Sequence, residues 1–250
     1  MSGTVYLVGA GPGAADLLTV RAARLLAEAD IVFHDALVPH AILALATRAE
    51  KIAVGKRSGR HSTAQQFINK RLADAARQHA IVVRLKGGDP LLFGRAQEEL
   101  DYLRAQGIAV QIVPGVTAAF AASADLQVSL TQRGVARSVA FVTPRVGKGE
   151  ADSTWLATVL AADTAAIYMG AGEALAISQA LIKAGKPAAT PVAVIENASL
   201  DAAVARGKLV ELPQLAAQLS GGPVLILLGE VLRKAVSAAR RATARRRQAR

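Results

Sequence analysis

The sequence contains no cysteine, and this absence removes several classes of chemistry. Disulfides, thiolate nucleophiles and cysteine-ligated metal or iron–sulfur sites are all excluded. Aromatic residues make up only 4% of the chain, so stacking platforms for single-stranded nucleic acid are poorly supplied. No run reaches the ~18 consecutive apolar residues of a membrane span, and the first residues lack the basic and apolar regions of a signal peptide. We therefore expect a cytoplasmic protein without a membrane partner.

Basic residues are abundant but unevenly distributed. The 250 residues include 30 Lys or Arg and 19 Asp or Glu, a net charge of +11. Eight of the basic residues fall in 233–250, which has no acid, so the rest of the chain carries only +3. We interpret 233–250 as a solvated tail. Binding of nucleic acid through this tail is the alternative from a different class of function.

Short apolar segments alternate with longer helical patterns, which predicts an α/β fold. The first half favours a largely parallel sheet. In the second half, strands follow one another with little helix between them, which favours some antiparallel pairing. We predict domains at 1–115 and 116–232, followed by the basic tail 233–250. The expected strands are 5–8, 31–33, 81–85, 110–113, 139–143, 165–168, 192–195, 208–212 and 224–228, and the expected helices are 16–29, 64–78, 95–105, a helix around 155, and 173–184.

A glycine-rich loop follows the apolar strand 81–85. Gly87 and Gly88 leave the backbone bare, so a small ligand can approach it closely. The adjacent Asp89 suits a ligand with hydroxyl groups or positive charge better than a phosphate. The alternative is a strand-to-helix turn in which Asp89 is only a cap.

A second glycine loop, Gly9–Gly13, follows the first predicted strand. Its spacing does not fit G-x-G-x-x-G, and Pro12 removes a backbone N–H that a pyrophosphate would use. We therefore expect the loop to make room for another part of the protein or for a flat ligand. Asp35 ends the next strand, where it is either a carboxylate facing a cleft or a helix cap.

Cationic groups suggest a polyanionic ligand. The glycine-punctuated loop 55–61 is either an anion site or a solvated loop, and Arg95 and Arg133 lie beside further glycines. Arginine forks match carboxylate geometry. Met169 precedes a glycine at a strand end, where a core role is usual and a wall for a sulfur-bearing ligand is the alternative. The four histidines show no metal-ligand spacing, so we expect no metal.

Taken in order, these segments resemble one family, the uroporphyrinogen-III C-methyltransferases within the tetrapyrrole methylases. The resemblance covers nearly the whole chain, from Val5 to Val231. Each motif alone is weak, whereas the ordered set is specific. The motifs are 8–13 (VGAGPG), Asp35 with 37–38, 54–57 with Gly59 and His61, Gln65 with 68–69, 84–90 (RLKGGDP), 93–95 (FGR), 113–115 (VPG), 133–134, 168–170 (YMG), 191–193 and 196–197.

The resemblance implies two α/β domains, each a mixed sheet flanked by helices, with S-adenosylmethionine bound between them in a homodimer. The implied activity is methylation of uroporphyrinogen III at C2 and C7, which gives precorrin-2 for sirohaem, haem d1 or cobalamin, with S-adenosylhomocysteine as by-product. A methylase of a later corrin precursor is the alternative within the superfamily. The sequence shows no dehydrogenase–chelatase half, so we expect methylation and no later step.

The resemblance also implies roles for individual residues. Asp35 matches the proton acceptor and Lys56 the proton donor. Three positions depart from the family pattern: Ala14 replaces an acid, with Asp16 two residues on, Gln132 replaces a histidine, and 143–147 replaces a Gly-His pair. The residues matching cofactor contacts are Pro12, Gly87, Gly88, Asp89, Leu92, Thr117, Ala118, Met169 and Ala198, and those matching substrate contacts are Arg95, Glu98, Arg133 and Met169.

Overall fold

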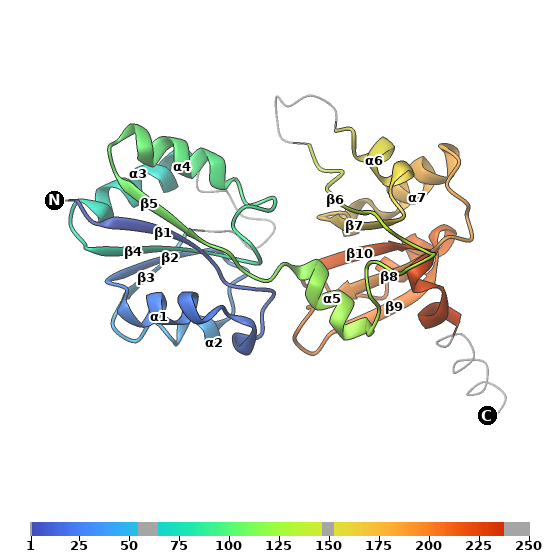
Figure 1. Ribbon diagram of the computed structural model, residues 1–250, viewed down its shortest axis with the longest axis horizontal. Helices are drawn as coiled ribbons and strands as arrows, with labels where there is room; N and C mark the ends of the chain where they lie inside the picture. The colour runs from blue at the N-terminus through green and yellow to red at the C-terminus, as the bar shows by residue number, and fades with distance from the viewer. Residues whose placement is uncertain (1, 55–64, 147–152, 238–250) are drawn as a thin grey trace. The chain divides into compact units, whose positions relative to one another are not determined.

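The chain folds into two compact units, the first ending at Ala118 and the second beginning at Ala119. The structure, a computed structural model, describes residues 2–54, 65–146 and 153–237. Each unit has its own five-stranded sheet with helices on both faces (Figure 1). The predicted α/β class with two sheets is confirmed. Within the described ranges, no helix has both the length and the apolar character needed to cross a membrane.

The sheet of the first unit is entirely parallel, in the order β3-β2-β4-β1-β5. The carboxyl ends of its strands therefore meet at one edge. Helices α1 and α2 cover one face, and α3 and α4 cover the other (Figure 1). The elements are β1 (Thr4–Gly9), α1 (Val20–Glu28), β2 (Ile31–His34), α2 (His40–Leu43), β3 (Glu50–Ala53), α3 (Gln65–Ala76), β4 (Ile81–Lys86), α4 (Ala96–Ala105) and β5 (Ala109–Val113).

Burial on both faces explains why these strands read as continuous apolar runs. On β4, Val82 packs under α3 and α4, whereas Val83 and Leu85 pack on the opposite side against α1 and α2. The predicted helix at 16–29 starts late, because Thr19 caps α1 by accepting a hydrogen bond from the Ala22 N–H at 3.2 Å. A 3₁₀ turn over 15–17 precedes it.

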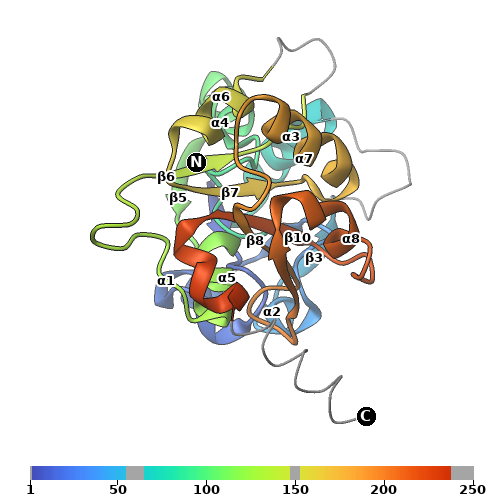
Figure 2. The ribbon, with the colours of Figure 1, turned by 90° about the vertical axis from the view of Figure 1, so that its right-hand side faces the viewer.

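The second unit has the order β6-β7-β10-β8-β9 (Figure 1), and Figure 2 shows this unit facing the viewer. Only β6 and β7 pair in parallel, and the other neighbours are antiparallel, which confirms the predicted change of pairing. Helix α5 packs on one face of the sheet, and α6, α7 and α8 pack on the other. The elements are α5 (Ala118–Leu126), β6 (Val139–Val142), α6 (Trp155–Ala161), β7 (Thr164–Tyr168), α7 (Ala174–Lys183), β8 (Pro191–Glu196), β9 (Ala203–Lys208), α8 (Leu212–Ala216) and β10 (Val224–Gly229).

The predicted strand at 208–212 is wrong. Strand β9 ends at Lys208, whose N–H donates to the Glu211 carboxylate at 2.8 Å, and a 3₁₀ turn followed by α8 continues the chain. Leu209 and Leu212 are both fully buried, and a spacing of three residues suits one face of a helix. Strand β3 and helices α2 and α5 are further elements that the sequence patterns did not indicate.

A buried acid holds the connection between β9 and β10. Glu196, at the end of β8, accepts hydrogen bonds from the Ser220 N–H at 3.0 Å, from the Ser220 hydroxyl at 2.9 Å and from the Gly222 N–H. The Ser220 N–H is the main cause that lowers the pKa of Glu196, and the Gly222 N–H adds to it against the opposing effect of burial.

A lowered carboxyl pKa stabilises the fold above the pKa of the unfolded chain, and this stability is lost as the pH falls through the folded pKa. We expect Glu196→Gln to lower the free energy of unfolding by about 1–3 kcal/mol at pH 7. The difference from wild type should shrink below about pH 4. Urea unfolding at both pH values checks this, with the exposed Glu173→Gln as control. A difference that did not change with pH would contradict the assignment.

Candidate functional site

The centre of the first sheet carries a topological switch point between β1 and β4. The chain leaving β1 enters α1 on one face, whereas the chain leaving β4 enters α4 on the opposite face. Open α/β sheets bind ligands at such points, outside the carboxyl ends of the strands. Gly11 and Gly88 meet there: the Gly88 N–H donates to the Gly11 carbonyl at 2.7 Å, and the Gly11 N–H donates back at 3.2 Å.

Two glycines, Gly9 and Gly115, allow the loops at this edge to touch backbone to backbone. A Cβ added to Gly9 would lie 2.6 Å from the Gly115 Cα, and one added to Gly115 would lie 2.3 Å from the Gly88 carbonyl oxygen. Gly9 therefore makes room for another part of the protein, the first of the two alternatives that its motif suggested. Gly87 differs, because within 4 Å its added Cβ would meet just one atom of the described ranges, the Leu37 Cβ at 3.7 Å. The Gly87 backbone is exposed and open to a ligand.

Asp89 connects two of these loops. Its Oδ1 accepts a hydrogen bond from the Leu91 N–H at 2.8 Å, and its Oδ2 accepts one from the Gly115 N–H at 2.9 Å. The carboxylate thus closes its own turn, as the capping alternative expected, and also ties the loop after β4 to the loop after β5. The other predicted cofactor residues of this unit follow β1, β4 and β5: Pro12, Gly87, Gly88, Leu92, Thr117 and Ala118.

Asp35 follows β2 at the same edge and is paired with a buried arginine. Arg84 Nη2 donates to Asp35 Oδ1 at 2.5 Å, and Arg84 Nε donates to Glu99 Oε1 at 3.1 Å. Lys86 Nζ contacts both oxygens of Glu99, at 3.1 and 3.0 Å. Gln65 Nε2 donates to Glu99 as well, at 3.1 Å. These five residues form a network that we call the Arg84 network.

In the Arg84 network, burial disfavours the charged forms of Arg84 and Lys86, whereas the nearby carboxylates favour them. Burial tends to lower the pKa of Arg84, but the charges of Asp35 and Glu99 outweigh it and raise that pKa above the ordinary value. Burial lowers the pKa of Lys86, and the nearby Arg84 charge lowers it further. The network contains two acids and two bases, so its formal charges balance.

Sequence reasoning assigned no role to Arg84, Lys86 or Glu99, although a signal existed. Arg84 and Lys86 alternate with apolar residues on β4, so both lie on one face of the sheet. Glu99 shares the buried face of α4 with Ala96, Leu100 and Leu103. An acid on the apolar stripe of a helix and two bases on one face of a strand predict a buried ion pair.

Arg95 and Glu98, both predicted to contact substrate, pair with each other on the surface. Arg95 Nε and Nη2 donate to the two Glu98 oxygens, each at 2.7 Å. The hydrogen bond from Arg95 is the main cause that lowers the pKa of Glu98. Arg95 and its neighbour Phe93 have left-handed backbones, with φ of +55° and +54°. Such strained residues concentrate at functional sites.

The second unit holds three of the predicted site residues. Met169 follows β7, is 45% exposed and has a φ of +56°. Ala198 is buried between Asn197 and Ser199, both of which have positive φ. Arg133 is exposed in a turn. Helix α5 is tied to the Tyr-Met-Gly segment, because the Ala119 N–H donates to the Tyr168 hydroxyl at 3.2 Å.

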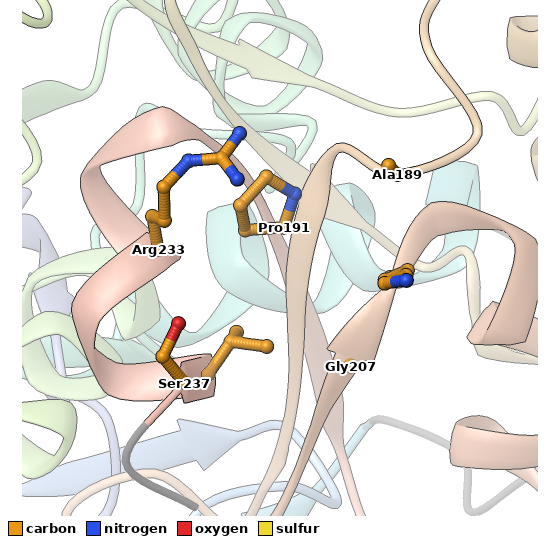
Figure 3. Close-up of a pocket in the computed structure, with 7 residues that line it drawn as sticks. Ala189, Pro191, Gly207, Arg233 and Ser237 are labelled. Carbon is orange, nitrogen blue, oxygen red and sulfur yellow. The ribbon is translucent and has the colours of Figure 1, made fainter. Parts of the chain in front are cut away.

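Two sequence predictions lie outside the described residues: Lys56 with the rest of the loop 55–61, and most of the basic tail. A pocket in the second unit contains none of the predicted site residues (Figure 3). One of its two basic side chains, Arg233, is paired with Glu230 through contacts of 2.5 and 2.7 Å. The residues that line the pocket are Ala189, Pro191, Gly207, Lys208, Arg233, Val236 and Ser237.

Comparison with known proteins gives consistent matches. The family profile of Tetrapyrrole (Corrin/Porphyrin) Methylases matches residues 4–213. A siroheme synthase of Pseudomonas fluorescens is 46% identical over 234 residues, which are 92% of this chain and 50% of that protein. Siroheme synthase 1 of Yersinia pseudotuberculosis is 47% identical over 232 residues, 92% of this chain and 49% of that protein. The chain thus spans about half the length of these curated relatives.

Among solved structures, a uroporphyrin-III C-methyltransferase from Thermus thermophilus complexed with S-adenyl homocysteine is similar to most of this chain. It is 39% identical in sequence, with a TM-score of 0.81, and the match covers 92% of this chain and 99% of that one.

The contact among the glycine loops can be tested by adding one methyl group. We expect Gly115→Ala to lower the free energy of unfolding by about 2 kcal/mol or more, because the new Cβ would overlap the Gly88 carbonyl oxygen. Gly172→Ala is the matched control, since its Cβ would meet no atom of the part of the chain that the structure describes within 4 Å. Urea unfolding of both variants measures the difference. Equal stabilities would mean that the loops do not touch as described.

Proposed function

Because this chain belongs to the tetrapyrrole (corrin/porphyrin) methylases, we propose that it methylates uroporphyrinogen III at C2 and C7 to give precorrin-2. The methyl donor is S-adenosylmethionine. Support comes from the similar Thermus thermophilus protein, a uroporphyrin-III C-methyltransferase that was solved in complex with S-adenyl homocysteine. The observation that carries the proposal is one sheet edge that combines a bare-backbone loop with a fixed carboxylate, Asp35.

The glycine loop after β4 fits a cofactor that contacts backbone. When bound, S-adenosylmethionine supplies an electrophilic methyl group on a sulfonium centre. Gly87 would let it approach the main chain, because among the described residues only Leu37 lies near the place that a side chain would occupy. Asp89 would hold the loop in shape through its bonds to the Leu91 and Gly115 N–H groups. The role of Met169 and Ala198 as cofactor contacts stays a prediction.

The substrate carries carboxylates around its rim, which suits arginine forks. Arg95 would bind one of these carboxylates, and its side chain is already held in place by Glu98. Ordering before binding lowers the entropy cost of recognition. Arg133 is exposed and would supply a second cation. Lys56 as proton donor stays a prediction.

Asp35 would act when the pyrrole ring becomes cationic. A pyrrole carbon forms its bond to the methyl group while the bond between that group and sulfur breaks, leaving positive charge on the ring. A carboxylate fixed nearby stabilises this charge. It then accepts the proton from the pyrrole N–H, which restores a neutral ring. Alignment of the reacting atoms would supply much of the remaining acceleration.

The role of Asp35 predicts a selective loss of turnover. We expect Asp35→Asn to lower kcat about 100-fold or more, while the Kd for S-adenosylmethionine changes less than about 3-fold, because the amide keeps the shape but not the charge. Mass analysis of labelled methyl groups added to uroporphyrinogen III measures turnover, and calorimetric titration measures cofactor binding.

The exposed Asp74→Asn on α3 is the control for this experiment, and it should keep wild-type turnover. A large loss of cofactor binding by Asp35→Asn would remove Asp35 from the chemical step. Methylation of a later corrin precursor, with none of uroporphyrinogen III, would favour the alternative substrate.

The open backbone at Gly87 predicts a loss of cofactor binding without a loss of stability. We expect Gly87→Val to leave the free energy of unfolding within about 1 kcal/mol of wild type, because its Cβ enters open space. The Kd for S-adenosylmethionine should rise about 10-fold or more, since the side chain occupies the cofactor's approach. Titration beside urea unfolding separates the two effects, and an unchanged Kd would move the cofactor away from this loop.

Three further properties stay predictions: a homodimer, a cytoplasmic location, and a solvated basic tail without a nucleic-acid partner. Val236 is buried in the second unit. A truncation meant to remove only tail charge should therefore begin after Ser237.

A further inference from the structure

The arginine at the centre of the first sheet is expensive to bury. Arg84 lies on β4, opposite Leu7 of β1 and Phe33 of β2, and both neighbours are buried and apolar. A buried charge is costly unless it is paired and hydrogen-bonded. Apolar side chains of similar volume often serve a core as well as buried ion pairs do. The charge at this position therefore suggests a role beyond stability.

Every nitrogen of the Arg84 guanidinium is engaged. Nε donates to Glu99, Nη1 donates to the Leu85 carbonyl at 3.2 Å, and Nη2 donates to Asp35. A planar fork held at three points has one orientation. The guanidinium therefore holds the carboxylate of Asp35 in one position. The Asp35 side chain is 29% exposed.

Glu99 anchors this fork from the α4 side. Its side chain is 0% exposed, and it receives hydrogen bonds from Lys86 and Gln65 as well as from Arg84. Lys86 balances the charge of Glu99, so the charge of Arg84 is balanced by Asp35. Gln65 lies at the start of α3, so its bond to Glu99 ties α3 into the same arrangement. Within α3, Gln65 also donates to Asn69 at 2.9 Å.

We propose that Arg84 is a positioning residue for Asp35, anchored by Glu99, and that it orients the carboxylate toward the substrate's pyrrole N–H. Oδ1 of Asp35 is held by Arg84, while Oδ2 accepts no hydrogen bond from any residue that the structure describes. Oδ2 is therefore the oxygen that accepts the proton. This inference rests on the proposed function, since it gives Arg84 a task in the same proton transfer.

The test combines substitutions at positions 84 and 35. Arg84→Lys keeps the charge but cannot bridge Asp35 and Glu99 as a fork, so we expect kcat to fall about 10-fold or more. KM and the Kd for S-adenosylmethionine should change less than about 3-fold. Arg84→Met should lose more turnover than Arg84→Lys. In an Asp35→Asn background, neither change should cost much further turnover, because residues that act through one another are not additive.

These variants should fold. Without Arg84, Glu99 keeps Lys86 as its counter-charge, and the partly exposed Asp35 can be hydrated. Lys186→Met is the matched control, because Lys186 is a structural cation of the second unit that donates to the Val159 carbonyl at 3.0 Å and the Ala162 carbonyl at 3.4 Å. It should lower thermal stability and leave kcat unchanged.

Two failures can be told apart. A wild-type protein that adds no methyl group to uroporphyrinogen III would overturn the proposed function. An active wild type in which the losses from Arg84→Met and Asp35→Asn multiply would overturn the inference alone. A rise in KM or Kd without a fall in kcat for the Arg84 variants would overturn it too.

Discussion

The pairing of Arg84 with Asp35 and Glu99 joins three parts of the first unit. The arginine lies in the middle strand, one acid lies on α4, and the other lies in the loop after β2. Burial of a guanidinium in an apolar sheet is costly unless the group is paired and hydrogen-bonded, so the position of each of its partners is constrained. The strand register, the helix and the edge loop therefore have to agree with one another.

The edge of the sheet combines this charged network with bare backbone. Gly9, Gly88 and Gly115 bring the loops after β1, β4 and β5 into contact, and Asp89 locks two of them together. The Arg84 network within the sheet thus holds Asp35 in place, while the glycine-rich loops that follow the strand ends carry few side chains. A site built on strand ends and held by a second layer of residues is suited to chemistry that depends on orientation.

Much of the fold could be predicted from the sequence, because strands buried on both faces read as apolar runs. The error at 208–212 arose where Leu209 and Leu212 were read as strand residues, although their spacing also suits a helix. Strand β3 was missed because Glu50 and Lys51 make it polar. Helix α5 was missed because its alanine-rich sequence shows little amphipathic pattern.

The candidate site was predictable only in part. The motifs indicated Asp35, Gly87 and Asp89, but not the contacts that hold them. The pairing of Arg84 with Asp35 depends on strand register, and its pairing with Glu99 depends on how α4 packs. Neither can be read from the local sequence. Gln65 and Asn69 illustrate this limit, since the resemblance included both, yet only the structure connects them to Glu99.

A crystal structure of the protein with S-adenosylhomocysteine tests the central claim most directly. We expect the ligand to lie against the backbone of Gly87 and Gly88, with the Asp35 carboxylate still bonded to Arg84. A ligand bound away from this loop, or an Asp35 side chain turned away from Arg84, would contradict the account.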